Sequence, residues 1–294
     1  MAVSNTYTYE TSFEDVLQDR LDAPTTWKEL TDVTITDTRV ISTSRLANPS
    51  VTTVTRGTGL VLTALTENAE TMTINTGRDL GVYVDLADLA QSPWTKPAEL
   101  FDRIGAILNE FIETDWLSQH ASWTNIGDVG GGAVGLGSTT LTVSASNIDD
   151  IIRGVKREIR RANGGMMMSM RGVGFDWRAQ DFEFLEAFTQ ANGYMTADKF
   201  LKDGTLEGLR YLGADHYWTN NNAANHIFAG VKKTQRLGIL RGTYGQAHVI
   251  NFPAADNADT NGTFLSGKAF YSRVDIGHLT PTAHATIVYD VNVA

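Results

Sequence analysis

Apolar residues recur at helical spacing from Pro97 to Trp123, the longest periodic stretch of the chain. This recurrence predicts an amphipathic helix with one buried stripe, and Pro97 suits its first turn because proline lacks an N–H. At 1.5 Å per residue, the helix would be about 40 Å long. We therefore expect the other elements to pack along it. Its apolar positions are Leu100, Phe101, Ile104, Ile107, Leu108, Phe111, Ile112 and Trp116.

A Thr-rich segment, residues 31–85, precedes this helix and is strand-like. Threonine, valine, isoleucine and tyrosine favour pleated surfaces. Residues 42–58 are polar on both faces, so a hairpin there has no face to bury within its own subunit. It is either a surface loop or an arm that lies on a neighbouring subunit, where strand edges can pair. The strand-like runs are Val33–Ile35, Arg39–Arg45, Leu60–Leu65, Thr71–Ile74 and Gly81–Val84.

Two further helices are expected after the long one. Residues 147–163 carry basic residues mainly opposite an apolar face, and this basic side is either solvated or contacts phosphates or an acidic neighbour. Residues 175–191 form the other helix, and Met166–Met170 between them predicts a buried strand. The expected core positions are Ile148, Ile151, Ile152, Val155 and Ile159 in the first helix, and Trp177, Phe184, Leu185 and Phe188 in the other.

The remaining elements are short. Helices are predicted at 12–22 and 196–201, and Ile126–Gly137 is expected to be a flexible connection because six of its residues are glycine. A half-buried strand is expected at the C-terminus, where apolar and polar residues alternate. Strand-like pieces occur at 138–143, 206–218, 226–231, 236–240, 246–252 and within 268–293.

Composition limits the class of protein. The chain has 294 residues, 42% of them hydrophobic and 20% charged, enough for one elaborate domain or two. It has no run of about 18 apolar residues, so we expect no membrane span, and its start lacks the pattern of a signal peptide. Because it has no cysteine, disulfides, thiolate catalysis and cysteine metal sites are excluded.

The net charge of −10 is unevenly distributed. Residues 1–150 contain 21 acidic and 8 basic residues, a net −13, whereas residues 151–294 contain 13 acidic and 16 basic residues, a net +3. This asymmetry serves solubility, or it gives one subunit surfaces of opposite sign that suit head-to-tail self-assembly.

The glycine-rich motifs do not predict nucleotide binding. Gly130, Gly132 and Gly135 have G-x-G-x-x-G spacing, but a dinucleotide site needs a strand before the motif and a helix that opens within it. Residues 262–269 resemble a phosphate-binding loop but end at Ala269, which has no hydroxyl to hold magnesium.

The histidines also predict no site. None lies in H-E-x-x-H, and Pro281 interrupts the strand register that His278 and His284 would share. There is no G-x-S-x-G nucleophile motif. We therefore expect no catalytic, cofactor-binding or metal-binding residues, no cofactor and no enzymatic activity. The six histidines are His120, His216, His226, His248, His278 and His284.

The order of these parts resembles the major capsid proteins of tailed bacteriophages, with the Hong Kong ninety-seven type fold. An N-terminal arm and a Thr-rich hairpin lead into the long helix. The helices of 147–163 and 175–191 follow, then a Gly-Thr-Leu-x-Gly turn at 204–208, a strand that ends near Asn220 and terminal strands. The resemblance covers nearly the whole chain and implies an α+β fold.

The resemblance also implies a division of the chain. Residues 1–31 would be the N-terminal arm, and 32–85 the peripheral strands with an extended β-hairpin loop at about 42–75. Residues 86–124 would be the spine helix of the peripheral domain, 125–262 an α/β axial domain, and 263–294 strands that return to the peripheral domain.

Such proteins are structural components of the virion, assembled in the host cytoplasm. They form hexamers and pentamers of an icosahedral head that encloses double-stranded DNA, which they contact non-specifically. The short arm implies a separate scaffolding protein, besides a portal and optional cement proteins. Some members cross-link through a lysine in the extended loop, but no lysine lies between Lys28 and Lys96.

Alternatives stay open from the sequence. An encapsulin-like bacterial compartment would use the same fold around enzymes, and a tail-tube protein would be β-rich and would lack the long helix.

Gly105 costs about 1 kcal/mol in a helix relative to alanine. It either lets the helix bend when an immature shell expands or makes room for a packed neighbour.

Overall fold

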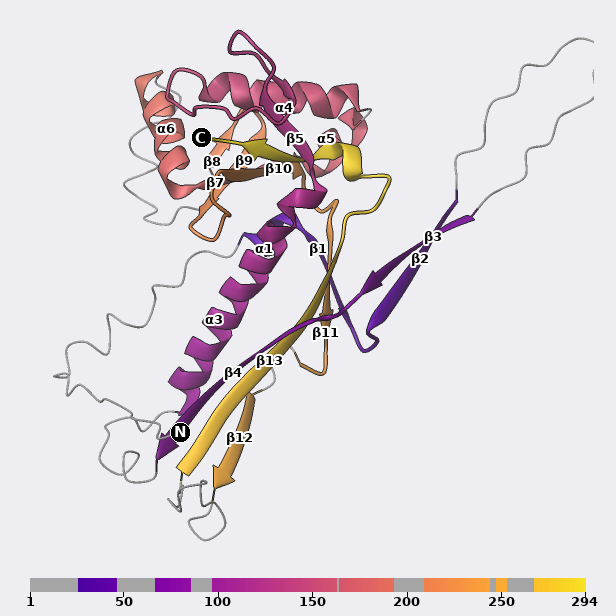
Figure 1. Ribbon diagram of the computed structural model, residues 1–294, viewed down its shortest axis with the longest axis vertical. Coiled ribbons are helices and arrows are strands. Elements are labelled where there is room, and N and C mark those ends of the chain that lie inside the picture. The colour runs from indigo at the N-terminus through magenta and orange to yellow at the C-terminus, as the bar shows by residue number, and fades with distance from the viewer. Residues whose placement is uncertain are drawn as a thin grey trace, which may run out of the picture.

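The fold is described from a computed structural model of the chain. The described residues are 26–46, 67–85, 97–162, 164–192, 209–243, 247–252 and 267–294. They form two separate β-sheets, a two-stranded ribbon and a long helix (Figure 1). None of the helices in these ranges is both long and apolar enough to cross a membrane.

The long helix is α3, Pro97–Leu117, and its last turn continues as the 3₁₀ helix η2, Ser118–Ser122. Of the eight predicted stripe positions, four are buried, Phe111 is partly buried and Ile107 is exposed, while the side chains of Leu100 and Phe101 lie outside the described part. The α-helix ends six residues before the expected Trp123, because the hydroxyls of serines in η2 donate to carbonyls of the preceding turn and favour the tighter form. The buried residues of the stripe are Ile104, Leu108, Ile112 and Trp116.

One face of α3 packs on a five-stranded sheet. Its strands are β1 (Asp32–Thr36), β4 (Thr76–Asp85), β11 (Arg236–Leu240), β12 (Ala247–Phe252) and β13 (Gly267–Leu279). The long β13 is central, since it pairs antiparallel with β4, β11 and β12, and β1 pairs parallel to β11. Apolar side chains of α3, the sheet and the short helix α1 (Trp27–Leu30) make one core.

A ribbon of β2 (Val40–Leu46) and β3 (Glu67–Thr73) lies at the base of the extended loop expected at about 42–75, and its strands pair antiparallel from Val40↔Thr73 to Leu46↔Glu67. Most of 42–58, where a hairpin was considered, lies outside the described residues. It projects away from the rest of the molecule in Figure 1. Within the described residues, neither strand pairs with a third strand. The strand expected at Leu60–Leu65 lies outside the described residues.

The second sheet has seven strands in the order β6-β5-β14-β10-β7-β9-β8. Helix α4 (Ile148–Arg161), with α5 (Gly165–Arg171) and α6 (Ala179–Ala191), packs with it in one apolar core, and all five expected core positions of α4 are buried. In α6, Leu185 is buried as expected, whereas Phe184 is exposed. The strands are β5 (Thr124–Asp128), β6 (Val134–Leu136), β7 (Val173–Arg178), β8 (Leu209–Tyr211), β9 (Ala214–Thr219), β10 (His226–Val231) and β14 (Val288–Asn292).

The central strands of this sheet are buried on both faces. Tyr289 and Ile227 belong to the core with α4, whereas Val288 and Phe228 belong to the core with α3. Every residue of β14 is accordingly buried. The end of α3 therefore meets the face of the sheet opposite α4, which joins the two parts of the molecule.

Some of the local predictions were wrong. Met166–Met170 is helical in α5, because unbranched methionine is a good helix former; Met166 is 76% exposed. The first four residues of the expected helix 175–191 belong to β7, and α6 begins at Ala179. Ile126–Gly137 is not a loose connection but the hairpin of β5 and β6.

The remaining short elements agree with the predictions only in part. Residues 138–143 form a single bridge, Leu141↔Val293, instead of a strand. The helices predicted at 12–22 and 196–201 lie outside the described residues. The strands expected at 226–231, 236–240 and 246–252 are confirmed as β10, β11 and β12. A strand at the C-terminus is confirmed as β14, but the expectation that it is half-buried was wrong, because both of its faces are covered.

The strand pairing divides the chain differently from the segments expected from sequence. Strands β11 and β12 belong to the five-stranded sheet, although they lie within 125–262. Strand β14 belongs to the seven-stranded sheet, although it lies within 263–294. The chain thus passes between the two sheets more often than a linear division allows.

Candidate functional site

The motifs considered in the sequence do not form a nucleotide or catalytic site in the described residues. Gly130 and Gly132 have positive φ in the tight turn between β5 and β6, and Gly135 lies in β6. The turn joins two antiparallel strands and does not open a helix. Residues 267–269 begin β13, a strand, so the second motif also lacks the helix that phosphate binding needs.

The basic side of α4 is largely occupied within the subunit. Arg153 pairs with Asp149 at 2.8 Å, and Arg161 lies 2.9 Å from Glu158. Lys156 donates to the carbonyl of Leu212. These pairings favour the interpretation of a solvated face over that of a phosphate-binding surface.

The ribbon of β2 and β3 has the features of an assembly surface. Five of the seven residues of β3 are exposed, and Met72 is its buried residue. The outer edges of a two-stranded ribbon carry backbone N–H and C=O groups that can pair with another chain. A two-stranded ribbon with almost no core of its own is only marginally stable by itself.

The root of the ribbon, in contrast, is fixed to the body. Gly238 of β11 and Gly277 of β13 are paired neighbours, and the chain leaving β3 crosses directly over them. A Cβ on Gly277 would lie 2.9 Å from the Cα of Ile74, and one on Gly238 would lie 2.6 Å from the Met72 Cε. The two glycines therefore form a shallow track in which Met72 and Ile74 become buried.

Polar contacts hold the ribbon on both sides of this track. Arg236 of β11 donates to the Thr43 hydroxyl at 2.6 Å, and the Thr282 N–H donates to Glu70 Oε1 at 2.9 Å. The direction in which the ribbon leaves the body is thus set by contacts within one subunit.

A buried polar cluster lies where residue 26 meets the end of α3. Glu113 is completely buried and its two carboxylate oxygens accept four hydrogen bonds. The donors are the Thr26 N–H at 2.5 Å and hydroxyl at 2.8 Å, the Thr219 hydroxyl at 3.0 Å and the Asn221 amide at 2.7 Å. This cluster attaches the segment before α1 to the helix and to β9.

Asp176 of β7 belongs to the same cluster. Its Oδ2 lies 2.9 Å from the Thr26 hydroxyl, and its Oδ1 has no hydrogen-bond partner among the described residues. Burial, and then the charge of Glu113, raises the pKa of Asp176 well above its ordinary value. The neutral form of Asp176 is therefore favoured in the folded protein.

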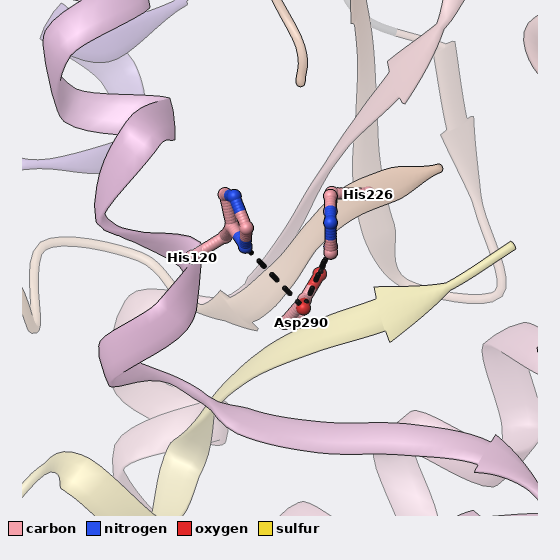
Figure 2. A group of neighbouring side chains, drawn as sticks. All are labelled: His120, His226 and Asp290. Atoms are coloured by element: carbon pink, nitrogen blue, oxygen red, sulfur yellow. Dashed lines mark hydrogen bonds and ion pairs between the residues drawn. The ribbon is translucent and has the colours of Figure 1, made fainter. Parts of the chain in front are cut away.

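Another cluster consists of His120, His226 and Asp290 (Figure 2). His226 Nδ1 lies 2.8 Å from Asp290 Oδ2, and His120 Nδ1 lies 3.8 Å from the same oxygen. The two imidazole rings stack with centroids 3.7 Å apart. Burial, then the charge of His226, lowers the pKa of His120, whereas burial raises the pKa of Asp290.

Sequence reasoning missed this cluster. Its members come from η2, β10 and β14, so no spacing along the chain links them. The pair considered in the sequence is separated in the structure: His278 contacts Asp115 at 2.6 Å, and His284 Nδ1 lies 3.1 Å from the Thr234 carbonyl. The available signal was that His226 begins and Asp290 lies within strands of otherwise apolar character.

Comparisons with known proteins were made by sequence and by structure. No family model and no curated protein matches the sequence. A structure described as Mycobacterium phage Che8 superposes with a TM-score of 0.60 and 16% identity, covering 99% of this chain and 94% of that one. The capsid of Ralstonia phage GP4 gives a TM-score of 0.61 and 9% identity, covering 99% and 96%.

A third structure, the mature capsid of bacteriophage PhiM1, gives a TM-score of 0.55 and 12% identity and covers 100% of this chain and 90% of that one. At these identities the likeness is one of fold. The chain has the α+β fold of these phage capsid structures over nearly its whole length.

Proposed function

We propose that this chain is a major capsid protein of a tailed bacteriophage, with the Hong Kong ninety-seven type fold. In this proposal, copies of the chain assemble into hexamers and pentamers and close an icosahedral head around double-stranded DNA. Its role is structural and not enzymatic. The observation that carries the proposal is the fold likeness to phage capsids across 99% of the chain.

The ribbon of β2 and β3 supports the same function. It is anchored at its root by Arg236 and by the glycine track, but projects from the subunit with exposed strands (Figure 1). A surface that is positioned but has no core of its own suits a contact with a neighbouring copy. The ribbon would then be the extended loop at about residues 42–75, and residues 1–31 would be the N-terminal arm.

The domain assignment follows the sheets in this proposal. The peripheral domain would comprise α3 as its spine together with β1, β4, β11, β12 and β13. The axial domain would comprise the seven-stranded sheet with α4, α5 and α6, and therefore includes β14.

Other components follow from the proposed role. A separate scaffolding protein would direct assembly in the host cytoplasm, a portal would occupy one vertex, and cement proteins could reinforce the mature shell. The DNA would be contacted without sequence preference, and the subunit would reside in the virion.

Electron microscopy of the purified protein, expressed with and without the neighbouring phage genes, tests the proposal. We expect closed icosahedral shells, with nuclease-protected DNA inside particles from infected cells. Shells that contain a cargo enzyme and no DNA would instead identify an encapsulin-like compartment. Open tubes or a persistent monomer at high concentration would contradict the capsid assignment.

A further inference from the structure

The cluster of His120, His226 and Asp290 lies at the junction between the two parts of the molecule. His120 belongs to η2, which extends α3, while His226 and Asp290 belong to the paired strands β10 and β14 of the seven-stranded sheet. In Figure 2 both imidazole rings present an edge to the same carboxylate. Side chains from three distant segments therefore converge on one point.

The chemistry of the cluster calls for a cation. The Asp290 side chain is 2% exposed, and a buried carboxylate is costly unless a positive charge or several donors compensate it. The basic groups that face it are the two imidazoles. Their rings are 3.7 Å apart, so protonating both would place two like charges in contact.

We infer that His120, His226 and Asp290 form a binding site for a divalent transition-metal ion, with zinc as the best match. Two neutral imidazoles and one carboxylate are a common ligand set for zinc, with bonds of about 2.0–2.2 Å. An ion resolves both electrostatic problems, because it neutralises the carboxylate and requires the imidazoles to be unprotonated.

The distances fit this ligand set. Tetrahedral ligands at these bond lengths lie about 3.3 Å from one another. The two Nδ1–Oδ2 separations of 2.8 and 3.8 Å lie on either side of that value, and the candidate ligand atoms all lie within 4.8 Å of one another. Binding requires the stacked rings to turn so that their nitrogen lone pairs converge on the ion.

The surroundings leave a path for the ion and room for a fourth ligand. The side chains of His120 and His226 are 24% and 27% exposed, so one side of the cluster faces solvent. A water molecule can complete the coordination from that side. The bound ion would link the end of α3 to β10 and β14, so its effect would be to stiffen the junction.

Zinc binding to the tag-free, chelator-treated protein tests this inference. We expect calorimetry and elemental analysis to give one zinc ion per chain and the melting temperature to rise with zinc concentration. Cobalt(II) in place of zinc should give the intense visible absorption of a tetrahedral site. Less than half an equivalent of zinc, or no rise in melting temperature, would overturn the inference.

Variants locate the site. His226→Gln and the partly exposed His120→Gln should each weaken zinc binding roughly 10- to 100-fold or more. The matched control is His278→Gln, since His278 also pairs with a carboxylate, Asp115, but lacks a second imidazole. Circular dichroism verifies that each variant is folded. Zinc binding that survives both cluster substitutions, or that His278→Gln abolishes, would assign the ion elsewhere and contradict the proposal. This test is independent of whether the protein forms a capsid.

Discussion

Asp176 and Glu113, both completely buried, share the hydroxyl of Thr26, which lies 2.9 Å from Asp176 Oδ2 and 2.8 Å from Glu113 Oε1. A hydroxyl has one proton and can donate to one of the two carboxyl groups. Because burial and the charge of Glu113 raise the pKa of Asp176, we expect Asp176 to hold a proton and donate it to the Thr26 oxygen, which leaves the Thr26 hydroxyl proton for Glu113. A chain of two hydrogen bonds therefore links β7, residue 26 and α3.

This proton assignment predicts effects of very different size for two isosteric substitutions. Asp176→Asn keeps a donor toward Thr26, so the free energy of unfolding should change by less than about 1 kcal/mol. Glu113→Gln removes a charge that accepts four hydrogen bonds and should cost about 3 kcal/mol. Urea denaturation at pH 7 measures both, and equal losses would contradict the assignment.

The same carboxyl group makes stability depend on pH. The pKa of Asp176 is raised in the folded protein from an ordinary value of 3.8, so the unfolded chain releases this proton first as the pH rises. The contribution is complete below about pH 4 and decreases as the pH rises toward the folded pKa. As the pH rises above about 4, the stability of the native protein should therefore fall relative to Asp176→Asn. A constant difference across that range would show that Asp176 is ionised in both states.

His216 acts in the opposite direction. It is buried, its Nδ1 accepts from the Trp177 indole at 3.0 Å and its Nε2 faces the Tyr211 carbonyl at 3.2 Å, so the neutral form fits the site. Burial lowers its pKa from 6.5 to about 4. Stability should therefore decrease as the pH falls from 6.5 to about 4, by on the order of 3 kcal/mol.

His216→Asn provides the control, because its amide oxygen can still accept from Trp177 but does not titrate. Urea denaturation of both proteins at about pH 7.0, 5.5 and 4.5 should give a difference that narrows as the pH falls. If the difference were independent of pH, the imidazole would be titrating normally.

Gly105 lies within α3, and a Cβ built on it meets nothing within 4 Å. Among the described residues of one subunit, therefore, none packs where a side chain at position 105 would lie. Gly105→Ala should stabilise the protein by up to about 1 kcal/mol, since alanine is the better helix former. If the helix must bend during shell expansion, the same substitution should also slow expansion, which electron microscopy can follow over time. Normal expansion with unchanged shell geometry would refute the hinge.

The glycine track predicts a large effect at Gly277 and almost none at Gly242. A methyl group on Gly277 would overlap the Thr73 carbonyl oxygen, whereas one on Gly242 meets nothing within 4 Å. Gly277→Ala should lower the free energy of unfolding by about 1–3 kcal/mol and reduce the yield of assembled particles. Gly242→Ala should be close to the native protein in both measurements. A fully stable, assembling Gly277→Ala would show that the ribbon root can shift freely.

The elements predicted best from the sequence are those whose buried positions recur at a regular spacing along the chain. All five apolar positions expected in 147–163 are buried, because a helix with one apolar stripe has few ways to satisfy it. The boundary at Arg178 was missed because β7 passes into α6 without glycine, proline or any other break. The methionine run was misassigned because methionine suits both a core strand and a helix.

The clusters could not be predicted for a different reason. His120, His226 and Asp290 are brought together by the pairing of β10 with β14 and by the docking of η2, which are properties of the tertiary fold. Glu113 occupied a polar position of an amphipathic helix, where a solvent-exposed carboxylate is the ordinary expectation. Its complete burial depends on donors from segments remote in sequence. These donors are Thr26, Thr219 and Asn221.

The chain crosses repeatedly between the part built on the five-stranded sheet and the part built on the seven-stranded sheet. It does so between α3 and β5, between β10 and β11, and between β13 and β14. These connecting segments thus run through one narrow junction between the two parts. At this junction the Trp116 indole N–H also donates to Gln235 Oε1 at 2.7 Å. Any tilt of one part against the other must twist all of these connecting segments together. The subunit should consequently bend at this narrow junction, while each of the two parts moves as a rigid body.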